Sequence, residues 1–468
     1  MEITTSEKGE SSRANYPEPI REFTEEERNN IKKQVTIYAG EAEKLKEEAQ
    51  RGSTSCIYRV LPQLKESNGD SLYEPNKVSI GPYYYKLRNE KFKMAEDCKK
   101  KCFGSMLVKT TDQDMQINTY LSCLQRISKL EEKIRKCYSE EFEVAGIEFL
   151  QMMVVDACFI IEIIEIFRFM NIDVKYRESD LGAFAWMVPY FYRDFLLLEN
   201  QIPFFVLEEI YALIHNIPVE ESTIPLRLDA LRFFKNGMKG YFFIRRDIPA
   251  MDGVPVSHLL DLVRRSLIPF NIGPRRVGFV RSPFIHCISK LQLAGIKVSP
   301  VRADSFLEVK FKKGVLEMPN IAVDDLTRCL LLNCVAFEQC QQRSGRYFSV
   351  YATFLHGLVN TKEDIEYLRE RKVIDNYLTD DSELAGFINR AGKDLVLDYY
   401  DGVYVMGELF MDVDRHYRNR WKWKWASFER EYIDKPWLLL SAAGGILLVV
   451  ATSVQAVMAI LSYKYKNC

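Results

Sequence analysis

Apolar residues recur at helical spacing along most of the chain, with polar residues at the intervening positions. Ser257 and Asp324 stand where two such stretches begin, and both residue types cap helix N-termini. We therefore expect a mostly α fold with a multi-helix globular body. The predicted helices cover residues 25–50, 91–138, 149–169, 226–234, 257–269, 324–340, 347–359, 361–372 and 381–392.

Two stretches of the body depart from helical spacing. Residues 305–319 alternate apolar and polar positions around Lys313-Gly314, which predicts one small β-hairpin element. Residues 56–85 carry turn signals such as Gly81-Pro82 and predict a compact, largely irregular segment.

An uncharged apolar run closes the sequence, from Trp437 to Tyr463. A helix over this run is long enough for a hydrocarbon core of about 30 Å, and Pro436 suits its first position. A buried core helix is the alternative, but such helices are usually shorter and show a polar stripe. We therefore predict a transmembrane helix that anchors the chain in a lipid bilayer, with Trp437 and Tyr463 at the two interfaces.

The residues before this run are rich in basic and aromatic side chains. Seven basic and three acidic residues lie between Arg415 and Lys435, an excess that favours a cytoplasmic amino side. Trp421, Trp423 and Trp425 alternate with lysines, a composition suited to an anionic headgroup layer. The alternative, which the residues leave equally open, is a solvated helix whose tryptophans pack on the body.

These patterns divide the chain into five parts. We expect a polar N-terminal extension with an exposed helix, a helical body, a basic aromatic juxtamembrane helix, the transmembrane helix and a short tail. The corresponding ranges are 1–50, 51–414, 415–436, 437–463 and 464–468.

The apolar helix predicted over 149–169 carries three acids, which would be costly in lipid but can be paired inside a protein core. It is therefore interpreted as a central buried helix. Glu162 and Glu165 share one face of it, and Asp156 lies earlier in the same helix. The functional interpretation is a carboxylate pair for acid/base chemistry. The favoured interpretation is a structural ion-pair network that includes Arg193 of the next aromatic helix.

A second polar group stands directly before a proline. Glu199, Asn200 and Gln201 precede Pro203, which interrupts a helix and leaves carbonyl groups without amide partners. The side-chain amides of Asn200 and Gln201 can donate to such carbonyls. We interpret this stretch as a buried polar joint between two helices.

Composition restricts the cellular compartment in which the protein is expected and the classes of partner that it is expected to bind. With 64 Lys and Arg against 65 Asp and Glu, the net charge of −1 excludes a dedicated nucleic-acid binder. The 11 cysteines are odd in number and scattered, there is no Asn-x-Ser/Thr acceptor, and the N-terminus lacks a signal-peptide pattern. The body is therefore expected to be cytosolic, on a plasma membrane or endomembrane that the sequence does not distinguish.

Catalytic signatures are missing from the sequence. It contains no GxxxxGK[ST], GxGxxG, HExxH or GxSxG motif, and its cysteines lack paired CxxC spacing. We therefore assign no catalytic residue, cofactor or metal ligand, and an enzyme is the less favoured hypothesis.

Several blocks, in order, resemble the plant DUF247 family, also called UPF0481. They are CIYRVLP (56–62), EPNKVSIGPYYY (74–85), MMVVDACFIIEI (152–163), LLLENQIPFFVLE (196–208), SFLEVKFKKGVLEMPNIAVDD (305–325), VAFEQC (335–340) and the terminal PWLLLSAAGGILLV. Where the family's glycine-proline-tyrosine block usually continues with two histidines and a glycine, this chain has Tyr84, Tyr85 and Lys86.

The resemblance implies a C-terminally anchored plant protein of undefined biochemical activity. Some grass members resemble self-incompatibility determinants, a role that does not transfer to so divergent a relative. Our leading hypothesis is an interaction, recognition or signalling protein with a protein partner, and homo-oligomerisation through the body or the anchor is a further expectation. The rival hypothesis is a membrane-tethered enzyme that uses Asp156, Glu162 or Glu165.

Overall fold

The computed structural model describes residues 23–108, 112–170, 188–238, 255–268, 285–303, 305–341, 345–397, 406–429 and 436–466. Two compact units are distinguished, Met1–Thr54 and Ser55–Cys468. The first contains one helix, α1 (Glu25–Thr54), among its described residues. Its N-terminus is a capping box, because the Thr24 and Glu27 side chains each accept the other residue's backbone N–H.

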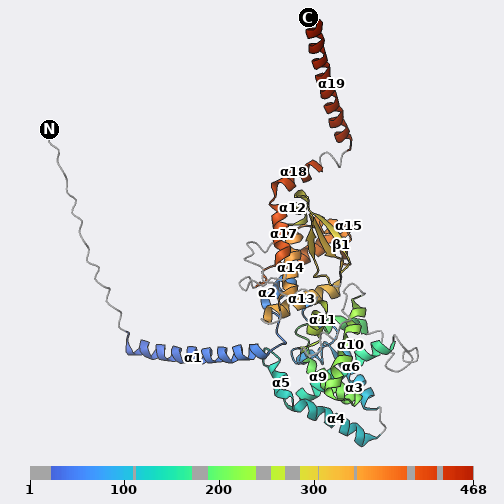
Figure 1. Ribbon diagram of the computed structural model, residues 1–468. Helices are drawn as coiled ribbons and strands as arrows, with labels where there is room; N and C mark the ends of the chain where they lie inside the picture. Colours follow the sequence, from blue (N-terminus) through green and yellow to red (C-terminus); the bar gives the residue numbers. More distant parts are fainter. Residues whose placement is uncertain are drawn as a thin grey trace, which may run out of the picture. The chain divides into compact units, whose positions relative to one another are not determined.

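The second unit is mostly helical (Figure 1). In chain order its helices are α2 (Pro62–Asn68), η1 (Asp70–Leu72), η2 (Tyr85–Leu87), α3 (Lys93–Leu107), α4 (Gln113–Ser128), α5 (Glu131–Lys136), α6 (Gly146–Met170), α8 (Val188–Asp194), α9 (Phe204–His215), α10 (Val219–Gly237), α11 (Leu259–Leu267), α12 (Ile288–Leu293), α13 (Asp325–Cys340), α14 (Tyr347–Leu358), α15 (Lys362–Glu370), α16 (Asp381–Ala391), α17 (Gly407–Tyr417), α18 (Arg420–Phe428) and α19 (Pro436–Lys466).

Helix α6 is the central helix of the first half of this unit. It packs against α3, α4, α9 and α10 (Figure 1), and nearly all of its side chains from Met152 to Ile166 are buried. The prediction of a central buried helix at this position is confirmed. Because other helices pack against α6 on several sides, its apolar residues occupy all faces of the helix instead of a single stripe.

The second half of the unit adds a small amount of sheet to a helical core. Strands β2 (Lys310–Lys312) and β3 (Val315–Pro319) pair antiparallel across Lys313-Gly314, both at positive φ, as the hairpin prediction requires. Strand β1 (Lys297–Val301) adds to β3 in parallel, and β4 (Ile321–Val323) pairs in parallel with β5 (Ile374–Asn376). These two parallel pairings were not predicted from the sequence.

The helices of this half begin close to the positions predicted. The Asp324 carboxylate accepts the N–H of Thr327 and caps α13, as expected. At α11 the prediction is wrong by one residue, because His258 rather than Ser257 caps the helix: its Nδ1 accepts from the N–H of Asp261. Residues 1–22 of the predicted polar N-terminal extension lie outside the described residues.

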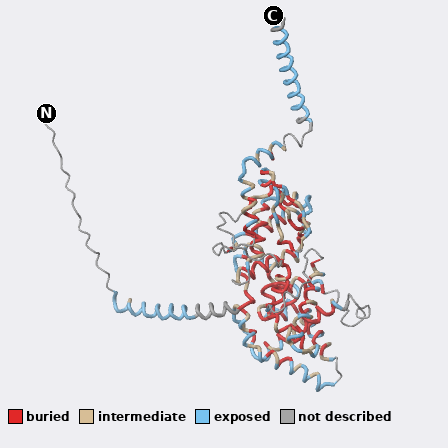
Figure 2. Tube along the Cα trace, viewed as in Figure 1, coloured by how far each residue is buried: buried red, intermediate tan, exposed pale blue. Residues whose placement is uncertain are grey.

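Helix α19 differs from every helix of the buried core in its exposure. Over Leu440–Tyr463 it is long and apolar enough to cross a membrane, and none of that window is buried among the described residues (Figure 2). The predicted apolar C-terminal helix is therefore present, beginning at Pro436. The red core of Figure 2 coincides instead with the helices that surround α6 and α13.

Candidate functional site

The irregular segment 55–92 is held by buried polar side chains from helices and loops that follow much later in the chain. Three carboxylates dominate this polar core: Asp156 on α6, Asp194 at the end of α8 and Glu199 just after it. Each is at most 1% exposed. A buried carboxylate is tolerated only where its oxygens are paired, so the contacts of each one define what it does.

Asp156 is fully buried, and both of its oxygens are saturated. Oδ1 accepts from Nη1 of Arg88 at 3.1 Å and Nζ of Lys99 at 2.7 Å, while Oδ2 accepts from Nη2 of Arg88 at 2.6 Å and the N–H of Gly81 at 2.8 Å. Burial alone would raise the pKa of Asp156, but the two cations outweigh it and hold that pKa below its usual value.

Lys99 completes this ion cluster with all three of its protons used. Besides Asp156, its ammonium donates to the carbonyl of Ser79 at 2.5 Å and to Glu96 at 2.6 Å. Burial, followed by the charge of Arg88, lowers the pKa of Lys99. The carbonyl of Ser79 and the N–H of Gly81 therefore tie the Ser79–Gly81 backbone to α3 and α6.

Gly81 is required where this backbone passes the polar joint. Its φ is +70°, and a Cβ built there would lie 2.5 Å from the backbone oxygen of Gln201. The adjoining residue Ile80 donates its N–H to Oδ1 of Asn200 at 2.7 Å. The glycine-proline turn and the Asn-Gln-Ile-Pro block are thus in direct contact.

Glu199 binds the beginning of segment 55–92 through hydrogen bonds and ion pairs. Its Oε1 accepts from the N–H of Val60 and from Lys65, each at 2.8 Å, and its Oε2 accepts from Arg59 at 2.9 Å and the Tyr84 hydroxyl at 2.6 Å. Burial opposes ionisation, but these donors, led by Lys65 and Tyr84, keep the pKa of Glu199 below its usual value. Tyr84, which stands where the family resemblance predicts histidine, is therefore a structural donor here.

Asn200 and Gln201 confirm the prediction of a buried polar joint. The Gln201 amide donates to the carbonyls of Phe195 and Leu197 at 2.7 and 2.8 Å, and the Asn200 amide donates to Val78 and Asp194 at 3.0 and 2.9 Å. Three of these carbonyls, from residues 194, 195 and 197, lie where α8 ends, and the fourth belongs to segment 55–92. Pro203 does not interrupt a helix as predicted, because it directly precedes the first residue of α9.

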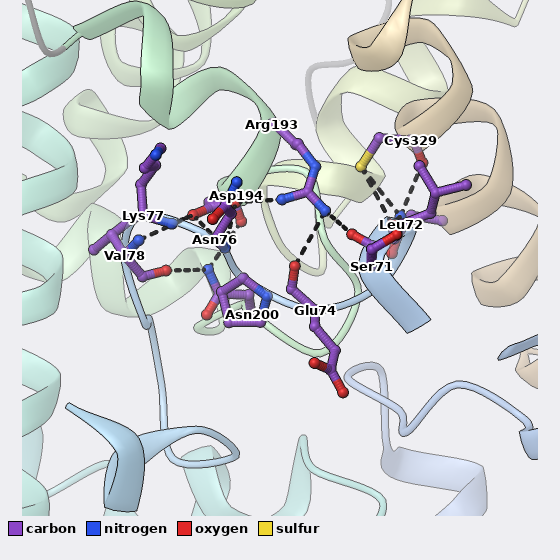
Figure 3. A network of polar contacts seen from close by, with 12 residues as sticks. Ser71, Leu72, Glu74, Asn76, Lys77, Val78, Arg193, Asp194, Asn200 and Cys329 are labelled. Carbon is purple, nitrogen blue, oxygen red and sulfur yellow. Dashed lines mark hydrogen bonds and ion pairs between the residues drawn. The ribbon is translucent and has the colours of Figure 1, made fainter. Parts of the chain in front are cut away.

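Asp194 and Arg193 form the part of the polar core seen in Figure 3. Asp194 accepts the backbone N–H groups of Asn76, Lys77 and Val78, and Arg193 Nη1 donates to it at 3.0 Å. Burial raises the pKa of Asp194 despite these donors. The other arm of Arg193 reaches the carbonyls of Ser71 and Glu74 (Figure 3).

Arg193 therefore does not join Glu162 and Glu165, and that part of the sequence prediction is wrong. Glu165 pairs with His215 at 2.7 Å, and Arg168 on the same helix pairs with Asp229 at 2.9 Å. Glu162 is buried beside Cys102 and contributes to raising that thiol's pKa, after the hydrogen bond of Cys98 and burial. The partners of Glu165 and Arg168 lie 50 and 61 residues further along the chain, a separation at which helical spacing cannot identify a pair.

A second buried ion cluster was missed by sequence reasoning. Glu338 on α13 accepts from Arg264 on α11 at 2.7 Å and from the N–H groups of Phe348 and Ser349 at the start of α14. The sequence offered one signal for it, a charged residue within the otherwise uncharged block VAFEQC. The cluster links three helices of the second half of the unit.

An open cleft of about 540 Å³ adjoins Asp194 and Arg193. It is also lined by Lys77, Tyr190, Tyr192, Asn236 and Asp325. Tyr190 is 53% exposed, and Lys77 Nζ lies 5.7 Å from the centre of its ring. The volume is within the usual range for small-ligand sites, and tyrosine and arginine, which both line it, are residue types enriched at protein interfaces.

The polar core acts as a clamp, a name we give to the contacts by which Asp156, Asp194 and Glu199 hold segment 55–92 in place. Asp156 and Glu199 are held ionised and each accepts four hydrogen bonds, so neither offers the unoccupied oxygen and near-neutral pKa of a general base. Among the described residues, no cluster of three or more His, Cys, Asp or Glu side chains could hold a metal ion.

The predicted membrane-interface tryptophans separate into two groups. Trp423 is half-buried, and its indole N–H donates to the carbonyl of Tyr417 at 2.6 Å. Trp421 and Trp425, one turn apart on α18, are 79% and 65% exposed. The alternative in which tryptophans pack on the body therefore holds for Trp423 but not for Trp421 and Trp425, and contact of these two with headgroups stays a prediction.

Comparison with known proteins finds one matching family model and two similar plant proteins. A family model described as "DUF247: Plant protein of unknown function" matches residues 57–451. The chain is 31% identical over 434 residues to UPF0481 protein At3g47200 of Arabidopsis thaliana, covering 87% of each protein. It is 23% identical over 493 residues to a second Arabidopsis UPF0481 protein, At3g02645, covering 86% of this chain and 89% of the relative. No solved structure matches significantly.

Proposed function

The chain belongs to the DUF247 family of plant proteins, and on this basis we propose that it is a single-pass, tail-anchored membrane protein whose cytosolic body binds another protein. The observation that carries the proposal is α19. Its described side chains are exposed from Leu440 to Tyr463, and so long a run of exposed apolar residues is unfavourable in water.

The thiols support a cytosolic body. No disulfide joins the ten cysteines among the described residues, although Cys98 and Cys102 are neighbours. Neighbouring cysteines without a disulfide are typical of a compartment that holds glutathione reduced. The basic excess before α19 favours the same side of the membrane.

The polar core favours binding over catalysis. In the rival hypothesis Asp156, Glu162 and Glu165 act on a substrate, yet Asp156 is saturated by Arg88, Lys99 and Gly81, and Glu165 is paired with His215. These contacts fix the fold of residues 55–92. The cleft beside Asp194 is the surface where we place partner recognition, because Tyr190 and Lys77 are presented at its edge.

Anchoring is tested by alkaline carbonate extraction of membranes that contain the full chain. We expect the wild-type chain to remain in the membrane pellet and the double variant Val450→Arg, Val454→Arg to be extracted. Each arginine at the centre of a spanning helix costs about 2.5–3.5 kcal/mol. Val396→Arg, at an exposed position of the body, is the matched control and should stay in the pellet. A wild-type chain that is extracted contradicts the anchor.

Partner recognition is tested by proximity labelling in plant tissue with full-length fusions. We expect Tyr190→Ala to lose labelled proteins that the wild-type chain retains. Tyr377→Ala, which removes a tyrosine of similar exposure at 55%, should keep them. Identical sets of labelled proteins for the wild type and both variants would show that the cleft is not the recognition surface.

A further inference from the structure

Helix α1 carries an exposed apolar stripe along a face that is otherwise charged. Ile31, Val35 and Tyr38 are 42%, 58% and 63% exposed. They follow one another at intervals of four and three residues, so they lie on one side of the helix. Ile37 falls outside this stripe. The helix lies in the compact unit that ends at Thr54, before the part of the chain that matches the family model.

The spacing of the stripe is that of a coiled-coil seam. With Val35 at position a of a heptad, Ile31 and Tyr38 occupy d positions and Ala42 the next a position. The sequence continues the alternation of three and four residues with Leu45 at d and Ala49 at a. Such a repeat favours packing against another helix of the same kind over packing on a flat surface.

The positions that flank the seam carry opposite charges on its two sides. The g positions are Gln34, Glu41 and Glu48, and the e positions are Lys32, Ala39 and Lys46. In a parallel pair g faces e of the second helix, so position 41, a glutamate in the sequence, faces position 46 of the other copy, a lysine. In an antiparallel pair g faces g and e faces e, which would bring like charges together.

We propose that α1 pairs with α1 of a second copy of this chain as a parallel, in-register two-stranded coiled coil. The occupant of the apolar stripe is thus an identical helix, selected by the heptad spacing and by the opposite charges at g and e. This inference goes beyond the proposed function and does not rest on the membrane anchor.

The seam is about three heptads long and contains two alanines, so the pairing is weak in dilute solution. If the chain is anchored as proposed, confinement to one bilayer raises the effective concentration of α1 and favours the dimer. Both copies would then enter the membrane from the same side, which suits a parallel arrangement.

Cysteine cross-linking of the full chain tests the pairing. Val35→Cys and Ala42→Cys each place a thiol at an a position, where it meets its own copy in a parallel dimer. We expect copper-phenanthroline oxidation to give a disulfide-linked dimer for both variants. Lys33→Cys, at the outward f position, is the matched control and should not exceed the wild-type chain, which carries the same native thiols.

Charge exchange tests the register. In the Val35→Cys background, Glu41→Lys or Lys46→Glu alone should cause loss of the linked dimer, and the two together should restore it. Equal cross-linking at positions 33 and 35, or none at positions 35 and 42, overturns the proposal. Such a result leaves the anchor intact, because carbonate extraction of the same variants reports on α19 alone.

Discussion

Asp156 shows how one buried carboxylate organises a segment with little regular structure, residues 55–92. It joins a cation from α3, a cation from the segment itself and the backbone N–H of Gly81. Removal of one member of a buried ion cluster leaves the others without a counter-charge, which is more harmful than the intact cluster is stabilising. The fold of segment 55–92 therefore depends on a small number of identifiable residues.

Asp156→Asn should destabilise the body by about 3–5 kcal/mol, because Arg88 and Lys99 stay buried without their anion. Urea unfolding of the full chain in detergent, followed by near-ultraviolet circular dichroism, measures the change. Asp412→Asn is the matched control. It breaks an exposed pair with Arg415, worth about 0–1 kcal/mol. Equal effects of the two variants would refute the clamp.

The burial of His258 predicts that the free energy of unfolding of the body depends on pH. Burial lowers its pKa from 6.5 to about 4, and its Nδ1 must stay unprotonated to accept the N–H of Asp261. The unfolded chain therefore takes up this proton first as the pH falls. Stability is fully present above pH 6.5 and declines towards pH 4, by about 3 kcal/mol from this group at roughly 1.4 kcal/mol per pKa unit.

His258→Asn keeps an acceptor at the helix cap but cannot titrate. We expect the variant to show a shallower decline of unfolding free energy between pH 6.5 and 4 than the wild-type chain, whatever its absolute stability. Parallel slopes for the two proteins would mean that another group dominates this range.

Gly81→Ala should destabilise the body by at least about 1–2 kcal/mol, since alanine at positive φ is strained and its Cβ would overlap the oxygen of Gln201. Gly104→Ala, inside α3 with open space around it, should instead be neutral or stabilising by up to about 1 kcal/mol. The thermal unfolding midpoints of the two variants should therefore move in opposite directions or differ clearly. A Gly81→Ala protein as stable as wild type would contradict the close approach.

At this scale the sequence predicts residue types better than partners. The amides of Asn200 and Gln201 satisfy carbonyls before Pro203 as expected, because both acceptor and donor lie within a few residues. Arg193 was assigned to the wrong carboxylates, since its true contacts include Ser71 and Glu74, more than 100 residues away along the chain. Contacts of that kind depend on tertiary packing, which periodicity does not encode.

Helix α18 is the element whose two faces have different roles. Ala426 is buried, and its Cβ lies 3.0 Å from a Cβ built on Gly295, so one face packs closely on the turn before β1. Trp421, Lys424 and Trp425 lie on the opposite face, and Lys424 stacks on the ring of Trp421 at 5.3 Å. An exposed face of indoles and lysines a few residues before α19 suits a lipid headgroup layer.

For α18 we expect lipid contact through Trp421 and Trp425 but not through Trp423. In vesicles with brominated lipid, the fraction of tryptophan fluorescence that is quenched should be smaller for the full-length double variant Trp421→Phe, Trp425→Phe than for the wild-type chain. It should be unchanged in Trp423→Phe, which removes an indole that packs on Tyr417. Loss of quenching in Trp423→Phe alone would reverse the assignment of the two faces.

The secondary structure was predictable where its signals are local. Helices α13 to α16 begin and end within about two residues of the predicted bounds, because caps and amphipathic spacing are short-range features. The hairpin was predictable from Lys313-Gly314. Strand β1 was not, since Lys297–Val301 contains Pro300 and finds its partner only through a parallel crossover to β3.

At the scale of the whole molecule, the buried charges and the exposed apolar runs of α1 and α19 belong to different elements. The ionised core of the second unit stabilises the helices around α6 and α13, while the large exposed apolar residues include those of α19 and the stripe of α1. Neither of these two helices is needed for the clamp. We therefore expect each to serve an interaction, with lipid for α19 and with a second copy for α1.

Protease treatment of intact microsomes that contain the full chain tests the central proposal most directly. If α19 anchors a cytosolic body, trypsin added outside should digest the body and spare a small membrane-bound fragment that retains residues 440–463. Detergent should leave the body's digestion unchanged. A body that is protected until detergent is added would contradict this account.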